Sequence, residues 1–207
     1  MKKTKGKFIT FEGSEGSGKS TQAKFLVQYL RSRGKQVVFL REPGGTKVSE
    51  KIRKILLDKN NHNMCSLTEM LLYMAARAQI VRETISPFLK KGYIIICDRF
   101  LDSTVAYQGY GLGVNLSLIR HLANFVTLGI NPDLTIFLDV AVLKGLRACG
   151  KKLDRIEQRA LVYHQRVRRA YLKLAAQYPS RIKIIKPEKD KMSTQAKIRK
   201  LILRYGL

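Results

Sequence analysis

The sequence has few cysteines and no long apolar run. Its three cysteines, Cys65, Cys97 and Cys149, are odd in number and lie 32 and 52 residues apart. This spacing suits neither a disulfide framework nor a CxxC zinc site, and it favours a reducing compartment such as the cytoplasm. No apolar run approaches the ~20 residues of a membrane-spanning helix, and the short apolar stretch near residue 8 is too brief for a signal peptide. We therefore expect no membrane partner.

Acidic residues are also scarce. The chain has 15 Asp and Glu against 40 Lys and Arg, a net charge of +25, and residues 141–207 alone hold 19 basic and 4 acidic residues. Such a field attracts nucleic acid or a phosphorylated small molecule, although a generally basic proteome explains it equally well. The 45% hydrophobic and 27% charged residues are typical of a globular protein, which excludes a disordered or collagen-like chain.

Short apolar stretches alternate with longer helix-like segments along the whole chain, without a linker or a repeat. Its 207 residues are near the size of one large α/β domain, and we treat residues 1–207 as a single domain. This alternation predicts a parallel sheet with helices on both faces. The expected strands span residues 8–11, 36–40, 93–97, 134–140 and 182–185. The expected helices span residues 19–33, 48–58, 66–91, 103–109, 116–128, 141–149, 156–178 and 193–205.

Residues 13–20 read GSEGSGKS and match the phosphate-binding motif GxxxxGK[ST] at every fixed position. The motif lies between an expected strand and an expected helix, which is the context it requires. Its glycines let backbone N–H groups turn inward around a phosphate, and the helix adds its positive N-terminal dipole. Lys19 can neutralise the outer phosphates, and Ser20 can ligate Mg²⁺. The residues expected to contact a nucleoside triphosphate are Gly13, Ser14, Glu15, Gly16, Ser17, Gly18, Lys19, Ser20 and Thr21.

Charged residues also follow two other expected strands. Asp98 and Arg99 follow the strand at 93–97, and Arg41 follows the strand at 36–40. The carboxyl ends of parallel strands share one edge of the sheet, where open α/β folds bind ligands. At that edge Asp98 is suited to holding the metal or its waters, and Arg99 is suited to a bidentate grip on phosphate.

Six segments taken together resemble thymidylate kinase of the bacterial kind. They are FEGSEGSGKST at 11–21, REPGGT at 41–46, LLYMAAR at 71–77, DRFLDSTVAYQG at 98–109, PDLTIFLDV at 132–140 and LDRIEQ at 153–158. The resemblance covers about residues 7–180. It implies a three-layer P-loop kinase fold with a five-stranded parallel sheet and a short lid at about 147–155. It also implies transfer of the γ-phosphoryl group of ATP to dTMP, with Mg²⁺, in the synthesis of dTTP.

The resemblance implies roles for individual residues. Lys19 and Arg99, with Mg²⁺, would neutralise charge on the transferring group, and a phosphate acceptor needs no general base. Glu15 corresponds to a carboxylate near the deoxyribose 3′-hydroxyl or the metal region, and Ser20 and Asp98 would hold the metal. The residues expected around dTMP are Arg53 and Arg99 at the phosphate, Tyr107 under the sugar, Tyr73, Arg77 and Thr104 around thymine, and Gln108 in the same set.

Arg155 is the residue expected to bring a lid cation to the phosphates, because Gly16 and Ser17 stand where some relatives carry a P-loop arginine. The lid also departs from the pattern: residues 150–152 are Gly, Lys and Lys where arginine is common, and a lysine lacks the planar fork of an arginine. Leu112 is a further position where an arginine would be usual.

The resemblance also implies a homodimer that uses apolar helix faces within 66–91 or 116–128. Two other functions stay open from the residues alone: a P-loop kinase of another nucleotide or small substrate, and a nucleic-acid-binding P-loop ATPase. The basic charge is the only support for the ATPase, and the sequence has no recognisable helicase, recombinase or aromatic RNA-binding motif. We therefore expect ATP and dTMP as ligands and no nucleic-acid partner.

Overall fold

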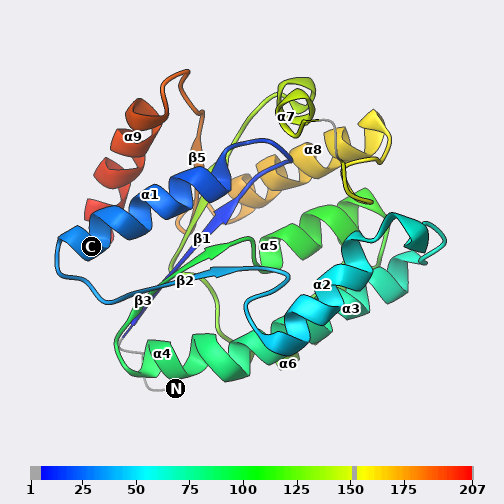
Figure 1. Ribbon diagram of the computed structural model, residues 1–207, viewed down its shortest axis with the longest axis horizontal. Helices are drawn as coiled ribbons and strands as arrows, with labels where there is room; N and C mark the ends of the chain where they lie inside the picture. The colour runs from blue at the N-terminus through cyan, green and yellow to red at the C-terminus, as the bar shows by residue number, and fades with distance from the viewer. Residues whose placement is uncertain (1–5, 151–152, 207) are drawn as a thin grey trace.

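The computed structural model describes residues 6–150 and 153–206, which form a parallel sheet between two layers of helices (Figure 1). The strands are β1 (Lys7–Glu12), β2 (Val37–Arg41), β3 (Ile94–Asp98), β4 (Leu134–Leu138) and β5 (Ile182–Ile185), in the order β2-β3-β1-β4-β5. All adjacent strands are parallel. The three-layer α/β fold and the five expected strands are therefore confirmed. No helix in these two described ranges is long and apolar enough to cross a membrane.

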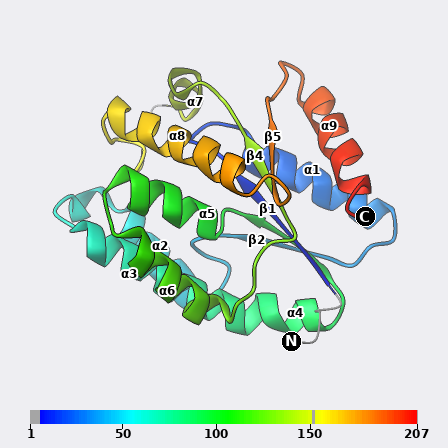
Figure 2. The same cartoon turned by 180° about the vertical axis from the view of Figure 1, so that it is seen from behind.

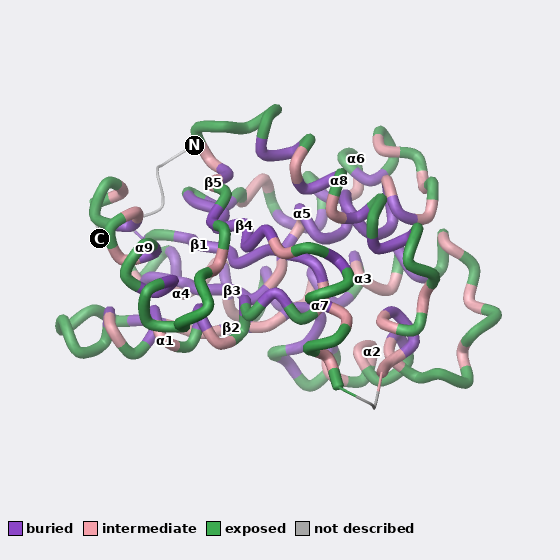
Figure 3. Tube along the Cα trace, turned by 90° about the horizontal axis from the view of Figure 1, so that it is seen from above, coloured by how far each residue is buried: buried purple, intermediate pink, exposed green. Residues whose placement is uncertain are grey.

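The central strands are apolar on both sides because helices cover both faces of the sheet. Almost every residue of β1, β3 and β4 is buried, as the purple centre of Figure 3 shows. Ile9 and Phe11 of β1 pack toward one helical layer, and Phe8 packs toward the other. Phe11 pairs with Asp98 across the β1–β3 ladder, which places the residues after β1 beside those after β3.

Two helices cover the first face of the sheet, α1 (Lys19–Ser32) and α9 (Lys191–Leu203), as Figure 2 also shows. Leu26 and Leu30 of α1 pack with Ile198 and Ile202 of α9 against β1, β3 and β4. These side chains are at most 1% exposed, and each contributes roughly 1.5–3 kcal/mol through burial. The packing holds the N-terminus of α1, and its positive dipole, at the carboxyl edge of the sheet.

The second face of the sheet is covered mainly by α8 and α3. Tyr171 on α8 stacks on Phe137 of β4 with ring centroids 5.0 Å apart, and Ile80 on α3 packs with Ile95 of β3. The helices α2 and α6 lie outside α3 and pack against it. The bounds are α2 (Lys47–Leu57), α3 (Ser66–Ile80), α4 (Ser86–Lys90), α5 (Leu101–Thr104), α6 (Leu116–Thr127), α7 (Val142–Ala148) and α8 (Leu161–Gln177), with a 3-10 turn at Lys59–Asn61.

Three expected helices differ in detail from the structure. The helix expected at 66–91 contains a π-helical turn at Val81–Ile85, and the one expected at 103–109 begins at Leu101 and continues as a π-helix to Gly111. The helix expected at 156–178 begins only at Leu161. The residues before it form turns because the Asp154 carboxylate accepts hydrogen bonds from the backbone N–H groups of the second and third residues after it, at 2.8 and 2.9 Å.

Candidate active site

The P-loop connects the carboxyl end of β1 to the first turn of α1. Gly13, Gly16 and Gly18 have φ angles of 154°, 62° and 85°, a region that other residues rarely adopt. Gly16 also touches the backbone of α7, because a Cβ atom there would lie 1.9 Å from the carbonyl oxygen of Gly145. These conformations leave the loop open toward the sheet edge, with Ser14 and Ser17 in its interior: both hydroxyls are buried and have no hydrogen-bond partner among the described residues.

A cation and a pair of hard oxygen groups lie beside this loop. Burial and the neighbouring Arg99 lower the pKa of Lys19, whose Nζ donates to the Ser14 carbonyl oxygen at 3.3 Å. The Ser20 hydroxyl donates to Oδ2 of Asp98, while the buried Oδ1 of Asp98 has no partner among the described residues. A hydroxyl and a carboxylate with a free oxygen are ligands that Mg²⁺ accepts, together with water and phosphate oxygens. The described residues contain no cluster of three acidic, His or Cys side chains that could hold a metal without such help.

Arg99 lies at the centre of the site. Its Nη1 donates to the Gly13 carbonyl oxygen at 2.9 Å and to the hydroxyls of Ser103 and Tyr171 at 3.1 and 3.3 Å. Its Nη2 donates to Oε1 of Glu15 and to the Tyr107 hydroxyl, both at 2.9 Å. These bonds fix a guanidinium between the P-loop and η3 (Val105–Gly111), the π-helical segment that carries Tyr107.

The carboxylate of Glu15 is held in its charged form. Burial opposes the charge, but Arg99 and Lys19 outweigh it, and Tyr107 donates to Oε1 of Glu15 at 2.6 Å. Together these groups lower the pKa of Glu15 to about 2. The side chains of Glu15 and Arg99 are only 15% and 16% exposed, so this pair is weakly screened by water.

A second carboxylate, Glu12, lies beneath Arg99 at the end of β1. It accepts hydrogen bonds from the Phe100 backbone N–H at 2.7 Å, the Ser103 hydroxyl at 2.6 Å and the Tyr171 hydroxyl at 2.8 Å. Burial, with Asp102 nearby, raises the pKa of Glu12 to about 7. Glu12 thus supports the two hydroxyls on which Arg99 rests.

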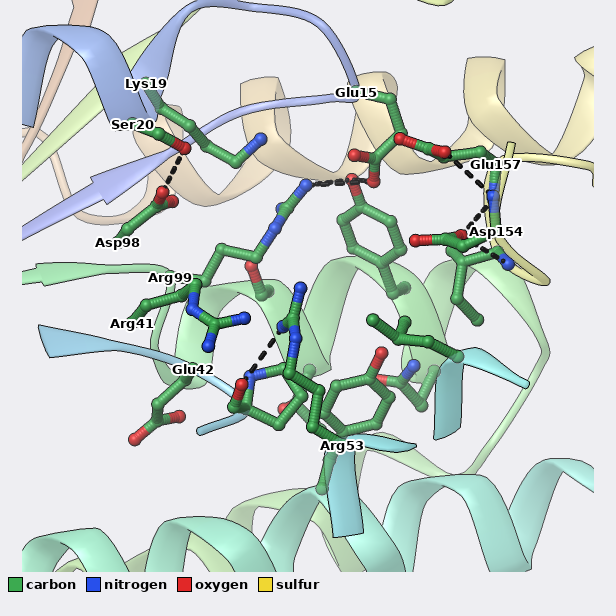
Figure 4. Close-up of a pocket in the computed structure, with 18 residues that line it drawn as sticks. Glu15, Lys19, Ser20, Arg41, Glu42, Arg53, Asp98, Arg99, Asp154 and Glu157 are labelled. Carbon is green, nitrogen blue, oxygen red and sulfur yellow. Dashed lines mark hydrogen bonds and ion pairs between the residues drawn. The ribbon is translucent and has the colours of Figure 1, made fainter. Parts of the chain in front are cut away.

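An open cavity of about 180 Å³ extends from the P-loop toward α2 and α3. Figure 4 shows the side chains of Arg41, Arg53 and Arg99 directed into it, with Lys19 at the P-loop side. Burial lowers the pKa of Arg53, and the like charge of the nearby Arg41 adds to this effect. The cavity is lined by Glu15, Lys19, Ser20, Arg41, Glu42, Pro43, Arg53, Leu57, Tyr73, Asp98, Arg99, Ser103, Thr104, Tyr107, Gln108, Asp154, Ile156 and Glu157.

Most residues expected at the acceptor line this cavity, but Arg77 does not. Arg77 is 1% exposed and lies behind Thr104, to whose hydroxyl oxygen it donates at 2.9 Å. Its other contacts are the Glu42 carboxylate at 2.8 Å and the Phe100 carbonyl oxygen at 3.0 Å. Because Thr104 accepts from Arg77, its own O–H is left to donate into the cavity. The structure therefore places Thr104 between Arg77 and any ligand.

Arg155 also lies away from the cavity. It belongs to residues 153–159, which we call the strap. Three other residues of the strap, Asp154, Ile156 and Glu157, line the cavity wall. Arg155 Nε donates to the Leu56 carbonyl oxygen at 2.8 Å, and Arg155 Nη2 lies 2.6 Å from Oε2 of the fully buried Glu69. In this structure Arg155 therefore ties the strap to α2 and α3 and does not reach the P-loop. The lid lysines Lys151 and Lys152 lie outside the described residues.

A smaller hollow lies on the other side of the P-loop. It is bounded by Gly18, Thr21 and Gln22, by Lys144 of α7 and by residues 187–191 before and at the start of α9. Thr21 is among the residues expected to contact the triphosphate, whereas Lys144 and residues 187–191 lie outside the recognised motifs and were not predicted.

Sequence reasoning also missed the buried acids Glu12, Glu42 and Glu69. Each is at most 3% exposed and holds a site residue: Glu12 holds the Arg99 network, Glu42 holds Arg77, and Glu69 holds Gln108 at 2.9 Å. A charged residue inside an otherwise apolar stretch is a detectable signal, since buried acids need partners. Their partners, however, are 35 to 159 residues away in the sequence, so the pattern alone could not name them.

Comparison with known proteins agrees with this site. The family model for thymidylate kinase matches residues 11–198. This chain belongs to the thymidylate kinase family. It is 44% identical over 202 residues to a thymidylate kinase of Thermoanaerobacter sp. (strain X514), covering 97% of this chain and 99% of that protein. It is 46% identical to a thymidylate kinase of Nostoc punctiforme, covering 95% of each. The crystal structure of thymidylate kinase from Ehrlichia chaffeensis superposes with a TM-score of 0.80 at 35% identity, covering 95% of this chain and 98% of the other.

Proposed function

We propose that this protein transfers the γ-phosphoryl group of ATP to dTMP, giving ADP and dTDP, as a step in the synthesis of dTTP. One observation carries the proposal: a single cavity joins Lys19 of the P-loop and Arg99 after β3 to the aromatic side chains Tyr73 and Tyr107. Cations suit an acceptor phosphate, and rings suit a nucleobase and its sugar. The acceptor phosphate is anionic near neutral pH and attacks without a general base, so catalysis rests on positioning and charge neutralisation.

The donor side of this proposal is the P-loop and the hollow beside it. The triphosphate would lie in the cradle of residues 13–21, where the unpartnered hydroxyls of Ser14 and Ser17 would find acceptors. The base would lie in the hollow between Gln22 and Lys144. Ser20 and Asp98 would hold Mg²⁺, which would neutralise charge on the outer phosphates.

The acceptor side is the larger cavity. Arg53 and Arg99 would hold the dTMP phosphate beside the P-loop, and the phosphate would offset the repulsion between Arg53 and Arg41. Tyr107, held by Glu15 and Arg99, would lie under the deoxyribose and exclude a 2′-hydroxyl. Thr104 would donate its O–H to O4 of thymine, with Arg77 acting through it.

The proposed role of Arg155 requires a rearrangement of the strap. To reach the transferring phosphoryl group, its guanidinium would have to leave Glu69 and the Leu56 carbonyl oxygen. The strap as seen here, with Arg155 bound to Glu69, would then be the resting state of the enzyme. Release of Arg155 from Glu69 would bring its guanidinium to the phosphates of the donor.

Three further properties belong to the proposal. The chain acts as one domain, since one continuous sheet carries both helical layers. It forms a homodimer through α3 and α6, whose surfaces expose Leu71 and Phe125, the latter at 74%. It works in the cytoplasm, where its three unpaired cysteines stay reduced.

A coupled ADP-release assay tests the function directly. We expect turnover with dTMP, less with dUMP, little with dCMP and UMP, and none with EDTA in excess over Mg²⁺. If UMP or CMP is phosphorylated as fast as dTMP, the acceptor is not specifically dTMP and the proposed function is wrong. Stimulation of ADP release by single-stranded DNA would favour the ATPase alternative instead.

A further inference from the structure

Glu69 is fully buried on α3, yet it is not among the cavity-lining residues. Its two carboxylate oxygens have separate partners. Oε1 accepts a hydrogen bond from the Gln108 side-chain amide at 2.9 Å, and Oε2 lies 2.6 Å from guanidinium nitrogens of both Arg155 and Arg159. The Arg159 guanidinium also lies 4.6 Å from the ring centroid of Tyr163, which limits its movement. Two cations thus hold the Glu69 carboxylate in one orientation.

An ionised carboxylate only accepts hydrogen bonds, so it decides how the Gln108 amide is turned. The NH₂ group must face Glu69, and the amide oxygen must face the other way. Gln108 is 1% exposed, lines the acceptor cavity beside Tyr73 and Thr104, and its amide oxygen accepts no hydrogen bond from the described residues. The cavity is therefore offered an acceptor from Gln108 next to the donor from Thr104.

We propose that Glu69 is a positioning residue that sets base selectivity by fixing the amide oxygen of Gln108 toward N3 of the acceptor base. The inference rests on the proposed function and deepens it. A thymine or uracil ring presents an N3–H donor beside the O4 acceptor, which matches the pair formed by Gln108 and Thr104. A cytosine ring presents an acceptor at N3 beside an amino donor, so both contacts would place like groups together and leave buried polar atoms unpaired.

The Glu69→Gln variant makes a sharp test. Arg155 and Arg159 would still attract the oxygen of the new amide, so its NH₂ group would face Gln108. Gln108 would then turn its oxygen toward residue 69 and present NH₂ to the cavity. We expect the ratio of kcat/KM for dTMP over dCMP to fall about tenfold or more, with dCMP unchanged or improved. Arg77 and Thr104 remain, so some preference for dTMP persists.

The matched control is Arg159→Gln, which removes one cation but leaves the Glu69 carboxylate, and that carboxylate only accepts a hydrogen bond from Gln108 whether Arg155 is docked or has moved to the phosphates. Its dTMP over dCMP ratio should stay within about twofold of the native protein. If Glu69 were only structural, Glu69→Gln would lower both substrates together and leave the ratio unchanged, and that result would overturn the proposal.

A measurement on the native protein covers the case in which Glu69→Gln does not fold. The N3-methyl analogue of dTMP keeps both carbonyl oxygens of thymine and has no N3–H donor. It should lose about tenfold or more in kcat/KM, and an analogue that performs as well as dTMP would refute the proposal. Absence of native activity on dTMP would instead refute the proposed function, so the two failures are distinguishable.

Discussion

The ion pair between Glu15 and Arg99 should make stability depend on pH in a way that a single substitution reveals. The pKa of Glu15 is lowered to about 2 from the 4.5 of a free side chain. A lowered carboxyl pKa stabilises the fold above pH 4.5, and this contribution is lost as the pH falls toward 2. A difference of about 2.5 units corresponds to about 3 kcal/mol at pH 7 and about 2 kcal/mol at pH 3.5.

Arg99→Met keeps the bulk of the side chain and removes the charge that sets this pKa. We expect the free energy of unfolding in urea to drop by about 3 kcal/mol at pH 7, with the gap to the native protein narrowing by about 1 kcal/mol at pH 3.5. The control is the same substitution in a Glu15→Gln background, where only Glu12 beneath Arg99 still titrates and the gap should narrow less than it does with Glu15 present. A gap that is constant with pH, or that narrows as much in the Gln background, would show that Arg99 does not control the pKa of Glu15.

Three more predictions follow from the site. Lys19→Ala should keep the native circular dichroism spectrum and lower kcat by about 10³-fold, since the lost charge acts mainly in the transition state; near-normal turnover would remove Lys19 from catalysis. Tyr107→Ala should raise kcat/KM for UMP relative to dTMP, whereas Tyr107→Phe should keep the sugar preference and lose the hydrogen bond to Glu15; equal sugar selectivity in both variants and the native protein would contradict the ring's role. Phe125→Glu should shift light scattering from dimer toward the 23.6 kDa monomer, and a native protein that is already monomeric would disprove the interface.

The sheet was predictable because its signals are local. Each strand is a short apolar run, and the P-loop is a contiguous motif. The strand at 8–11 and the phosphate-binding loop at 13–20 can therefore be recognised without knowledge of the rest of the chain. The start of α8 was not predictable in the same way. Residues 156–160 carry a helical pattern, but the Asp154 carboxylate and the docking of Arg155 on the end of α2 hold them as turns, and these tertiary contacts override the local preference.

The sequence predicted which residues lie at the candidate site better than it predicted the contacts among them. Motif position placed Thr104, Tyr107 and Gln108 near the acceptor, and they do line the cavity. It could not show that Arg77 lies behind Thr104 or that Arg155 is held by Glu69, because each arrangement is decided by which buried acid lies within reach of a long, flexible guanidinium. Sequence spacing carries no information on that choice when the acid comes from another part of the fold.

The backbone conformation of Arg99 lets two consecutive side chains, those of Asp98 and Arg99, face the P-loop. In a strand, consecutive side chains point to opposite faces, so Asp98 and Arg99 could not both face the P-loop. Arg99 has φ of 71°, a left-handed conformation that costs a residue with a Cβ atom about 1–2 kcal/mol. This turn lets Asp98 meet Ser20 while Arg99 meets Gly13 and Glu15. A glycine would relieve the strain but would lose the guanidinium, so five hydrogen bonds from Arg99 offset a backbone conformation that the site itself requires.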